Sequence, residues 1–235
     1  MAVIRCIVFD LDDTLYTEWD FVSAGFGYVA KELEHLGFGR LEAIQKTLSD
    51  IHWKEGREHV FDKAAARLGF PVTLVPDLVR IYRGHPPSVQ LAPDAIVVLD
   101  AFRARIMLGC VTDGIADVQR RKVEALGLSH WIEGIIFTDD LGREFWKPHP
   151  RSIEMLCGRF GVRPDETVFV GDNPKRDSKA ARNAGVRSVR IRRPGGYFSQ
   201  MSESADMADY NIASLTELLG LVDMKDKAWK QIGRM

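Results

Sequence analysis

The chain has 235 residues, of which 46% are hydrophobic and 28% are charged, and its formal net charge is −1. This balance is typical of a globular protein and excludes a largely disordered chain. A net charge near zero gives no overall field that would attract nucleic acid or an anionic membrane. No apolar stretch approaches the ~20 residues of a membrane-spanning helix, so we expect a cytoplasmic protein without nucleic-acid or membrane partners.

The first apolar run, residues 3–9, is rich in β-branched residues and is followed by an Asp-Leu-Asp-Asp-Thr segment at residues 10–14. Such a run predicts a strand that is buried on both faces, as in a parallel sheet. The next region, residues 18–82, shows helical periodicity and little strand signal, so it predicts a compact helical insert. A Gly-His-Pro-Pro segment at residues 84–87 interrupts this pattern and marks a domain boundary.

From residue 93 onward, strand and helix patterns alternate. We predict strands at 106–111, 134–138, 167–170 and 186–191, separated by helices at 93–102, 116–126, 148–160 and 174–184. Ile96, Leu99 and Phe102 are predicted to form the buried face of the first of these helices. The alternation predicts a doubly wound α/β fold, in which a parallel sheet of about five strands lies between two layers of helices.

Polar residues follow the predicted strands at their carboxyl ends, which meet at one edge of a parallel sheet. They include Asp10, Asp12, Thr112, Asp172 and Asp177. Carboxylates gathered at one edge repel one another unless a cation or a lysine lies among them, and their hard oxygen ligands favour magnesium. Each segment alone is typical of a turn or a helix cap, but several in order at strand ends predict a catalytic site.

These segments resemble the four motifs of the haloacid dehalogenase-like hydrolase superfamily in order and position, at 10–14, 111–114, 147–148 and 171–177. The likeness covers about residues 3–212, and the helical insert resembles the helical cap of many members. The resemblance implies a Rossmann-like α/β catalytic core with a small all-helical cap. The expected domains are the core at 1–16 and 88–222, the cap at 17–87 and a loosely attached C-terminal tail at 223–235.

The resemblance implies that Asp10 attacks phosphorus and forms an aspartyl-phosphate intermediate. It implies that Asp12 donates a proton to the leaving group and then takes one from water. It also implies a magnesium ion held by Asp10, the main-chain carbonyl of Asp12, and Asp172. The cofactor that we expect is therefore Mg²⁺.

Further residues of the motifs are implied to contact or support the transferring phosphoryl group. They are Leu11, Thr112, Asp113, Gly114, Lys147, Asn173 and Asp177. The hydroxyl of Thr112 and backbone amides around Leu11 and Asp113 would cradle the group, and Lys147 would neutralise its growing charge. Asp177 would orient Lys147 or a metal-bound water.

The carboxylate of Asp12 favours phosphate chemistry, because the dehalogenating members of the superfamily lack it and need no metal. We therefore expect a hydrolase that acts on a small phosphorylated metabolite. A phosphomutase would keep the same motifs, and a non-enzymatic binding or regulatory module is a further alternative. Release of inorganic phosphate separates the hydrolase from the mutase, and magnesium binding without turnover would favour the binding module. The sequence identifies neither the substrate nor the oligomeric state, and a homodimer through exposed cap helices stays open.

Two polar groups in the sequence are left without a role in the predicted site. His52, Trp53, Arg57 and His59 form a dense polar-aromatic group in the insert, and we interpret them as a helix-loop surface rather than as contacts to the leaving group. The Arg-Arg-Lys segment at residues 120–122 is interpreted as a solvated helix face.

Overall fold

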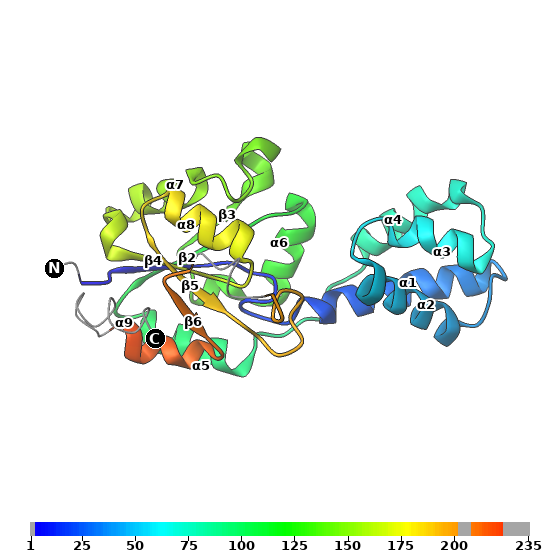
Figure 1. Ribbon diagram of the computed structural model, residues 1–235, viewed down its shortest axis with the longest axis horizontal. Helices are drawn as coiled ribbons and strands as arrows, with labels where there is room; N and C mark the ends of the chain where they lie inside the picture. Colours follow the sequence, from blue (N-terminus) through cyan, green and yellow to red (C-terminus); the bar gives the residue numbers. More distant parts are fainter. Residues whose placement is uncertain (1–2, 202–207, 223–235) are drawn as a thin grey trace. The chain divides into compact units, whose positions relative to one another are not determined.

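The computed structural model describes residues 3–201 and 208–222, and the predicted tail at 223–235 lies outside these ranges. The chain divides into two compact units. One contains the residues up to Glu18 together with those from Val89 onward, and the other is Trp19–Ser88. The first is an α/β unit and the second is helical (Figure 1). The role of the helical unit as a cap stays a prediction.

A six-stranded, fully parallel sheet forms the centre of the α/β unit. Its strands are β1 (Cys6–Phe9), β2 (Met107–Thr112), β3 (Gly134–Phe137), β4 (Thr167–Gly171), β5 (Arg187–Ile191) and β6 (Tyr210–Ile212). They lie in the order β3-β2-β1-β4-β5-β6. The predicted doubly wound parallel sheet is confirmed. The sheet exceeds the expected size of about five strands because β6 pairs with β5.

Helices connect the strands and cover both faces of the sheet. They are α5 (Pro93–Phe102), α6 (Ala116–Ala125), α7 (Arg151–Phe160), α8 (Lys179–Asn183) and α9 (Leu218–Val222). In Figure 1, α7 and α8 lie together on one face, and α5 and α9 lie on the opposite face. Short 3₁₀ turns join these elements at Leu128–His130, Thr138–Leu141, Arg143–Phe145, Pro164–Glu166 and Leu215–Glu217.

The side chains of β1 alternate between the two faces of the sheet. Cys6 and Val8 belong to the apolar cluster that contains Ile153 of α7 and Ala180 of α8. The intervening residue Ile7 points to the opposite face and, like its neighbours, is fully buried. Burial on both faces explains why this strand is a continuous apolar run in the sequence.

Helix α5 buries a different set of side chains from the predicted one. Ala95, Val98, Leu99 and Phe102 are buried, but Ile96 is 39% exposed, so its predicted burial is wrong. The buried positions follow the three- and four-residue spacing of one helix face. Because nearly every residue of α5 is apolar, the sequence pattern alone does not fix which face contacts the sheet.

The predicted helix at 174–184 is two elements in the structure. A π-helical turn, η6 (Pro174–Ser178), comes first and α8 follows it. The side-chain oxygen of Asn173 accepts hydrogen bonds from the backbone N–H groups of Lys175 and Arg176, at 3.1 and 3.3 Å, and so caps the turn. Single π-helical turns of this kind are frequent at functional sites.

Four helices build the helical unit, in the positions that the apolar stripes predict. They are α1 (Glu18–His35), α2 (Leu41–Glu55), α3 (Val60–Leu68) and α4 (Val75–Gly84), with a 3₁₀ turn at Val72–Leu74. Their apolar faces pack into one core. Gly25 of α1 is part of this packing, because a Cβ atom there would lie 2.6 Å from the ring of Tyr82 in α4. Only glycine allows the two helices to approach so closely.

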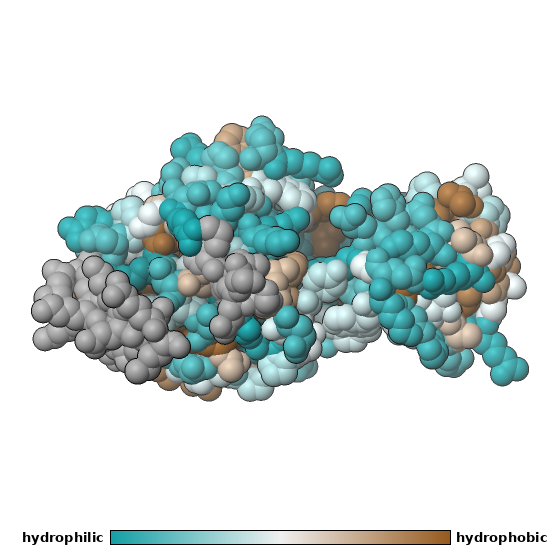
Figure 2. All heavy atoms as spheres, viewed as in Figure 1, coloured by the Kyte–Doolittle hydropathy of each residue, from teal (hydrophilic) through white to brown (hydrophobic). Residues whose placement is uncertain are grey.

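The surface seen in Figure 2 is mostly hydrophilic. Exposed apolar side chains, such as Val3 and Val72 at 74% and 61% exposure, are normal on folded proteins. No helix within the described ranges is both long and apolar enough to cross a bilayer.

Candidate active site

The carboxyl ends of β1 and β4 lie side by side at the centre of the sheet. The chain runs from β1 outward to β3 and then returns to β4, so the strand order reverses between β1 and β4. Doubly wound sheets bind ligands at such a reversal, outside the carboxyl ends of the strands. Asp10 directly follows β1 and Asp172 directly follows β4, which places both at this edge.

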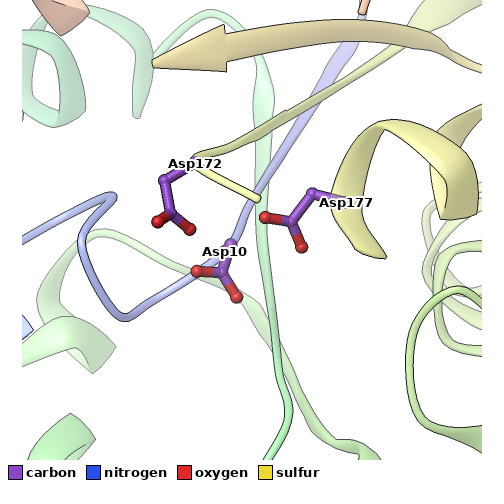
Figure 3. Close-up of side chains that lie close together, drawn as sticks. All are labelled: Asp10, Asp172 and Asp177. Carbon is purple, nitrogen blue, oxygen red and sulfur yellow. The ribbon is translucent and has the colours of Figure 1, made fainter. Parts of the chain in front are cut away.

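Three carboxylates converge here (Figure 3). Asp10, Asp172 and Asp177 each place a carboxylate oxygen within 4.8 Å of the others. Their side chains come from the ends of β1 and β4 and from η6, and they point toward one another. All three residues are at most 9% exposed. Burying three acids together is unfavourable unless positive charge lies among them.

Lys147 supplies positive charge within this cluster. Its ammonium group donates a hydrogen bond to Asp10 and lies 2.8 Å from a carboxylate oxygen of Asp177. Burial opposes the charge of this lysine. The carboxylates of Asp10, Asp177 and Asp113 outweigh that effect, and they hold the pKa of Lys147 well above its ordinary value. Lys147 is therefore a cation at any physiological pH.

One lysine does not balance the surrounding acids. Burial raises the pKa of Asp10 well above its ordinary value, with Lys147 opposing this shift and Asp177 and Asp12 adding to it. The pKa of Asp172 is also raised well above its ordinary value, by burial and then by Asp177 and Asp10. Closely spaced oxygen ligands with uncompensated negative charge fit a hard divalent cation such as Mg²⁺.

The backbone at the end of β4 is shaped around Asp177. A Cβ atom at Gly171 would lie 2.4 Å from Oδ2 of Asp177, so only glycine leaves room for this carboxylate. The backbone N–H of Asn173 donates to the same oxygen at 2.9 Å, and the other oxygen faces Lys147. This arrangement is compatible with Asp177 orienting Lys147, which stays a prediction.

Asp12 lies in a network of hydrogen-bond donors that the sequence did not predict. Its carboxylate accepts from the Tyr16 hydroxyl, from Lys122 Nζ at 2.7 Å and from Gln119 Nε2 at 2.8 Å. Gln119 also donates to the hydroxyl of Thr112, so it links the first and second motifs. Burial alone would raise the pKa of Asp12, but Lys122, Tyr16 and Gln119 outweigh it and lower the pKa.

The interpretation of residues 120–122 as a solvated helix face is wrong for Lys122. Arg120 is exposed and pairs with Asp140, whereas Lys122 is 3% exposed and pairs with Asp12. Lysine is almost never fully buried unless it has a partner, and this partner lies 110 residues away in the sequence. The sequence contained one indication that Lys122 belongs to the site, because Gln119 and Lys122 lie one turn apart on the helix that follows the second motif.

The second motif also positions the third. The carboxylate of Asp113 accepts hydrogen bonds from the Thr138 hydroxyl at 2.8 Å and from the backbone N–H of Lys147 at 3.1 Å. Asp113 therefore fastens the segment that carries Lys147 to the end of β2. Gly114, with a φ of 113°, turns the chain toward α6 in a conformation that other residues rarely adopt. Phosphate binding by the backbone amides of Leu11, Asp113 and Gly114 stays a prediction.

The chain is similar to known hydrolases over most of its length. The haloacid dehalogenase-like hydrolase family profile matches residues 7–191. The glyceraldehyde 3-phosphate phosphatase of Methanopyrus kandleri is 28% identical over 229 residues, which are 94% of this chain and 97% of that protein. The phosphoserine phosphatase of Thermus thermophilus is 35% identical over 138 residues, which are 58% of this chain and 55% of that protein.

Similarity to solved structures extends to the fold. A magnesium-bound HAD-hydrolase from Bacillus subtilis superposes with a TM-score of 0.70 at 17% identity, covering 94% of this chain and 100% of that chain. The family match spans both strand ends that carry the acidic cluster. The chain therefore belongs to the haloacid dehalogenase-like hydrolase family, and it is a hydrolase of the phosphatase type.

Proposed function

We propose that this hydrolase is magnesium-dependent and cleaves a small phosphomonoester through an aspartyl-phosphate on Asp10. The observation that carries the proposal is the cluster of Asp10, Lys147, Asp172 and Asp177 at the ends of β1 and β4. It combines an anionic nucleophile with an adjacent fixed cation, at the edge of the sheet where this class of fold binds ligands.

In the first step, a carboxylate oxygen of Asp10 attacks phosphorus, an oxygen–phosphorus bond forms, and the bond to the leaving oxygen breaks. The leaving oxygen takes a proton from the carboxyl group of Asp12. Lys147 holds Asp10 through its hydrogen bond and offsets the negative charge of the phosphoryl group. Thr112 lies at the end of β2, where its hydroxyl would orient a phosphoryl oxygen.

In the second step, water attacks phosphorus, gives its proton to the carboxylate of Asp12, and displaces Asp10 to release inorganic phosphate. Tyr16, Gln119 and Lys122 donate to Asp12 and stabilise the carboxylate form that this step needs. The first step uses the protonated form, so Asp12 must gain a proton before the leaving group departs.

Asp10, Asp172 and the main-chain carbonyl of Asp12 would hold the magnesium ion. When bound, the ion would supply the positive charge that lets an anionic nucleophile approach an anionic phosphate. Support comes from the raised pKa values of Asp10 and Asp172, which reflect burial first and then neighbouring carboxylates that Lys147 alone does not offset. Asp177 belongs to the same cluster, but its pairing with Lys147 favours a supporting role.

The proposal is tested by measuring phosphate release from a panel of phosphomonoesters, with magnesium and with EDTA. The panel includes glyceraldehyde 3-phosphate and phosphoserine, because relatives are named for activity on them. We expect magnesium-dependent release that is lost in Asp10→Asn. The control is Asp117→Asn, which removes a carboxylate whose side chain is 90% exposed and which should retain full activity. Undiminished release by Asp10→Asn would sink the proposal.

A second measurement addresses the covalent intermediate. Hydroxylamine converts an aspartyl-phosphate into a hydroxamate, which changes the peptide mass at the modified residue. We expect this modification at Asp10 only when substrate and magnesium are both present. Transfer of phosphate between hydroxyls of one sugar without release would indicate a phosphomutase instead. Magnesium binding without turnover of any compound would indicate a binding module.

A further inference from the structure

A pocket lies within the helical unit and takes no part in the proposed reaction. Its volume is about 400 Å³, which falls in the range of roughly 300–1,000 Å³ that is usual for small-molecule sites. Helices α1, α2, α3 and α4 and the loop between α2 and α3 all contribute to its wall. Every lining residue belongs to Trp19–Ser88, so the pocket is a feature of this unit alone.

Three aromatic rings and three valines form the apolar part of the wall. The ring centroids of Phe26, Phe61 and Tyr82 lie 5.6–6.2 Å from one another. Phe26 and Phe61 are at most 8% exposed, so the core packing of the unit fixes their positions. A preformed aromatic wall offers a large contact area to an apolar group at little cost in conformational entropy.

The charged groups of the pocket are mainly basic. Arg57 comes from the loop after α2 and Arg83 from α4. Asp62 of α3 is the acidic residue among those that line the pocket, and it lies 3.5 Å from the ring of His59. The lining therefore carries two guanidinium groups and one carboxylate. Guanidinium groups pair well with carboxylates because their planar donors match both oxygens.

His52 adds a neutral polar group to the wall. It is 6% exposed, which corrects the interpretation of this residue as part of an exposed helix-loop surface. Burial, and then the positive charge of Arg57, lower the pKa of His52 to about 4. At physiological pH its ring is therefore neutral and can both donate and accept a hydrogen bond.

We propose that this pocket binds a small carboxylic acid with an apolar or aromatic body. The carboxylate would pair with Arg57 and Arg83, and the body would pack against Phe26, Phe61 and Tyr82. The acid is a ligand of the helical unit and is separate from the phosphorylated substrate. The proposal does not depend on the phosphatase activity.

The test uses the full chain without magnesium or substrate, so that turnover is not required. The probes are benzoate, phenylacetate and 3-phenylpropionate, each compared with its neutral primary amide. Binding is followed by NMR of the histidine side chains, with the signal of His52 assigned from His52→Gln. We expect at least one acid at about 10 mM to shift this signal and to raise the pKa of His52, with the amide binding roughly tenfold more weakly.

Two variants locate the acid. Arg57→Gln should weaken binding of the acid by roughly tenfold or more and leave the amide unchanged. Arg80→Gln is the matched control, because this exposed arginine of α4 pairs with Asp77 at 2.8 Å and does not line the pocket. Equal affinity for acid and amide, an unchanged affinity in Arg57→Gln, or no response of His52 to any of the acids would overturn the proposal.

Phosphatase assays with the bound acid then show whether its site is separate from the substrate. An acid that changes kcat acts as an effector from its own site, whereas one that only raises KM competes with the substrate and contradicts a separate site. A protein that binds the acids in this pocket but releases no phosphate would support the site and contradict the proposed function, so the two can fail independently.

Discussion

Replacing Lys122 with methionine tests how the donors around Asp12 serve the proposed reaction. Lys122 Nζ lies 2.7 Å from Asp12 Oδ1, and the two side chains are 4% and 21% exposed. A hydrogen bond between charged groups contributes about 1.5–3 kcal/mol, and methionine keeps the length of the lysine stem without its charge. If Lys122 acts by fixing Asp12, kcat should fall by about tenfold to a hundredfold, because 1.4 kcal/mol corresponds to a factor of about ten.

The assay compares a poor and a good leaving group. An alkyl phosphate needs a proton from Asp12, whereas 2,4-dinitrophenyl phosphate loses a stable anion without one. Because Lys122 stabilises the carboxylate form of Asp12, and the second step that uses this form is the same for both esters, we expect the loss on the dinitrophenyl ester as well as on the alkyl phosphate. Arg120→Met is the control, because it removes a charge from the same helix where the side chain is 46% exposed and pairs with Asp140.

Two results would refute this reasoning. A loss confined to the alkyl phosphate would mean that Lys122 serves proton donation to the leaving group rather than the carboxylate form of Asp12. Unchanged activity on both esters would mean that Gln119 and Tyr16 alone suffice to hold Asp12. Melting temperatures of Lys122→Met and the wild type separate a loss of fold from a loss of catalysis.

Three further predictions concern the metal, a glycine and a histidine. The raised pKa of Asp172 lowers the stability of the metal-free fold as the pH rises above 3.8, so Asp172→Asn should raise its melting temperature at pH 7 and abolish stabilisation by Mg²⁺. In urea titrations, Gly171→Ala should lose about 1–3 kcal/mol because its Cβ would meet Asp177, whereas Gly158→Ala, with open space around it, should lose nothing. The pKa of His52 falls from 6.5 to about 4 on folding, so the folded protein favours the neutral ring. The free energy of unfolding should therefore decrease as the pH falls from 6.5 to 4, by at most about 3 kcal/mol, and His52→Gln should remove this dependence. The metal argument fails if Mg²⁺ still raises the melting temperature of Asp172→Asn. The packing argument fails if Gly171→Ala is as stable as the wild type, and the histidine argument fails if wild type and His52→Gln respond to pH in the same way.

The strands of the sheet could be predicted because a strand buried on both faces is a continuous apolar run. The predictions at 134–138 and 167–170 differ from β3 and β4 by a single residue at one end. The first strand is shorter than 3–9 because its pairing with β2 and β4 begins at Cys6. The π-helical turn η6 could not be predicted, since its shape depends on tertiary contacts of Asp177.

Much of the candidate site could be predicted for a similar reason. Asp10 and Asp172 directly follow strands, and the carboxyl ends of parallel strands meet at one edge. Lys122 could not be predicted, because its burial depends on which face of α6 contacts the end of β1. The pocket beside His52 was also beyond sequence reasoning, since four helices build its wall and no local pattern records how they pack.

The central position of β1 affects how the chain folds as it is synthesised. β1 leaves the ribosome before both of its partner strands, which begin only at Met107 and Thr167. The helical unit Trp19–Ser88 has its whole core in one continuous segment, so it can fold while the sheet is incomplete. Pairing across such long separations is slow, which makes the α/β unit the later one to form. A nascent chain halted before β4 would therefore carry a folded helical unit and no active site, although its nucleophile had already been made.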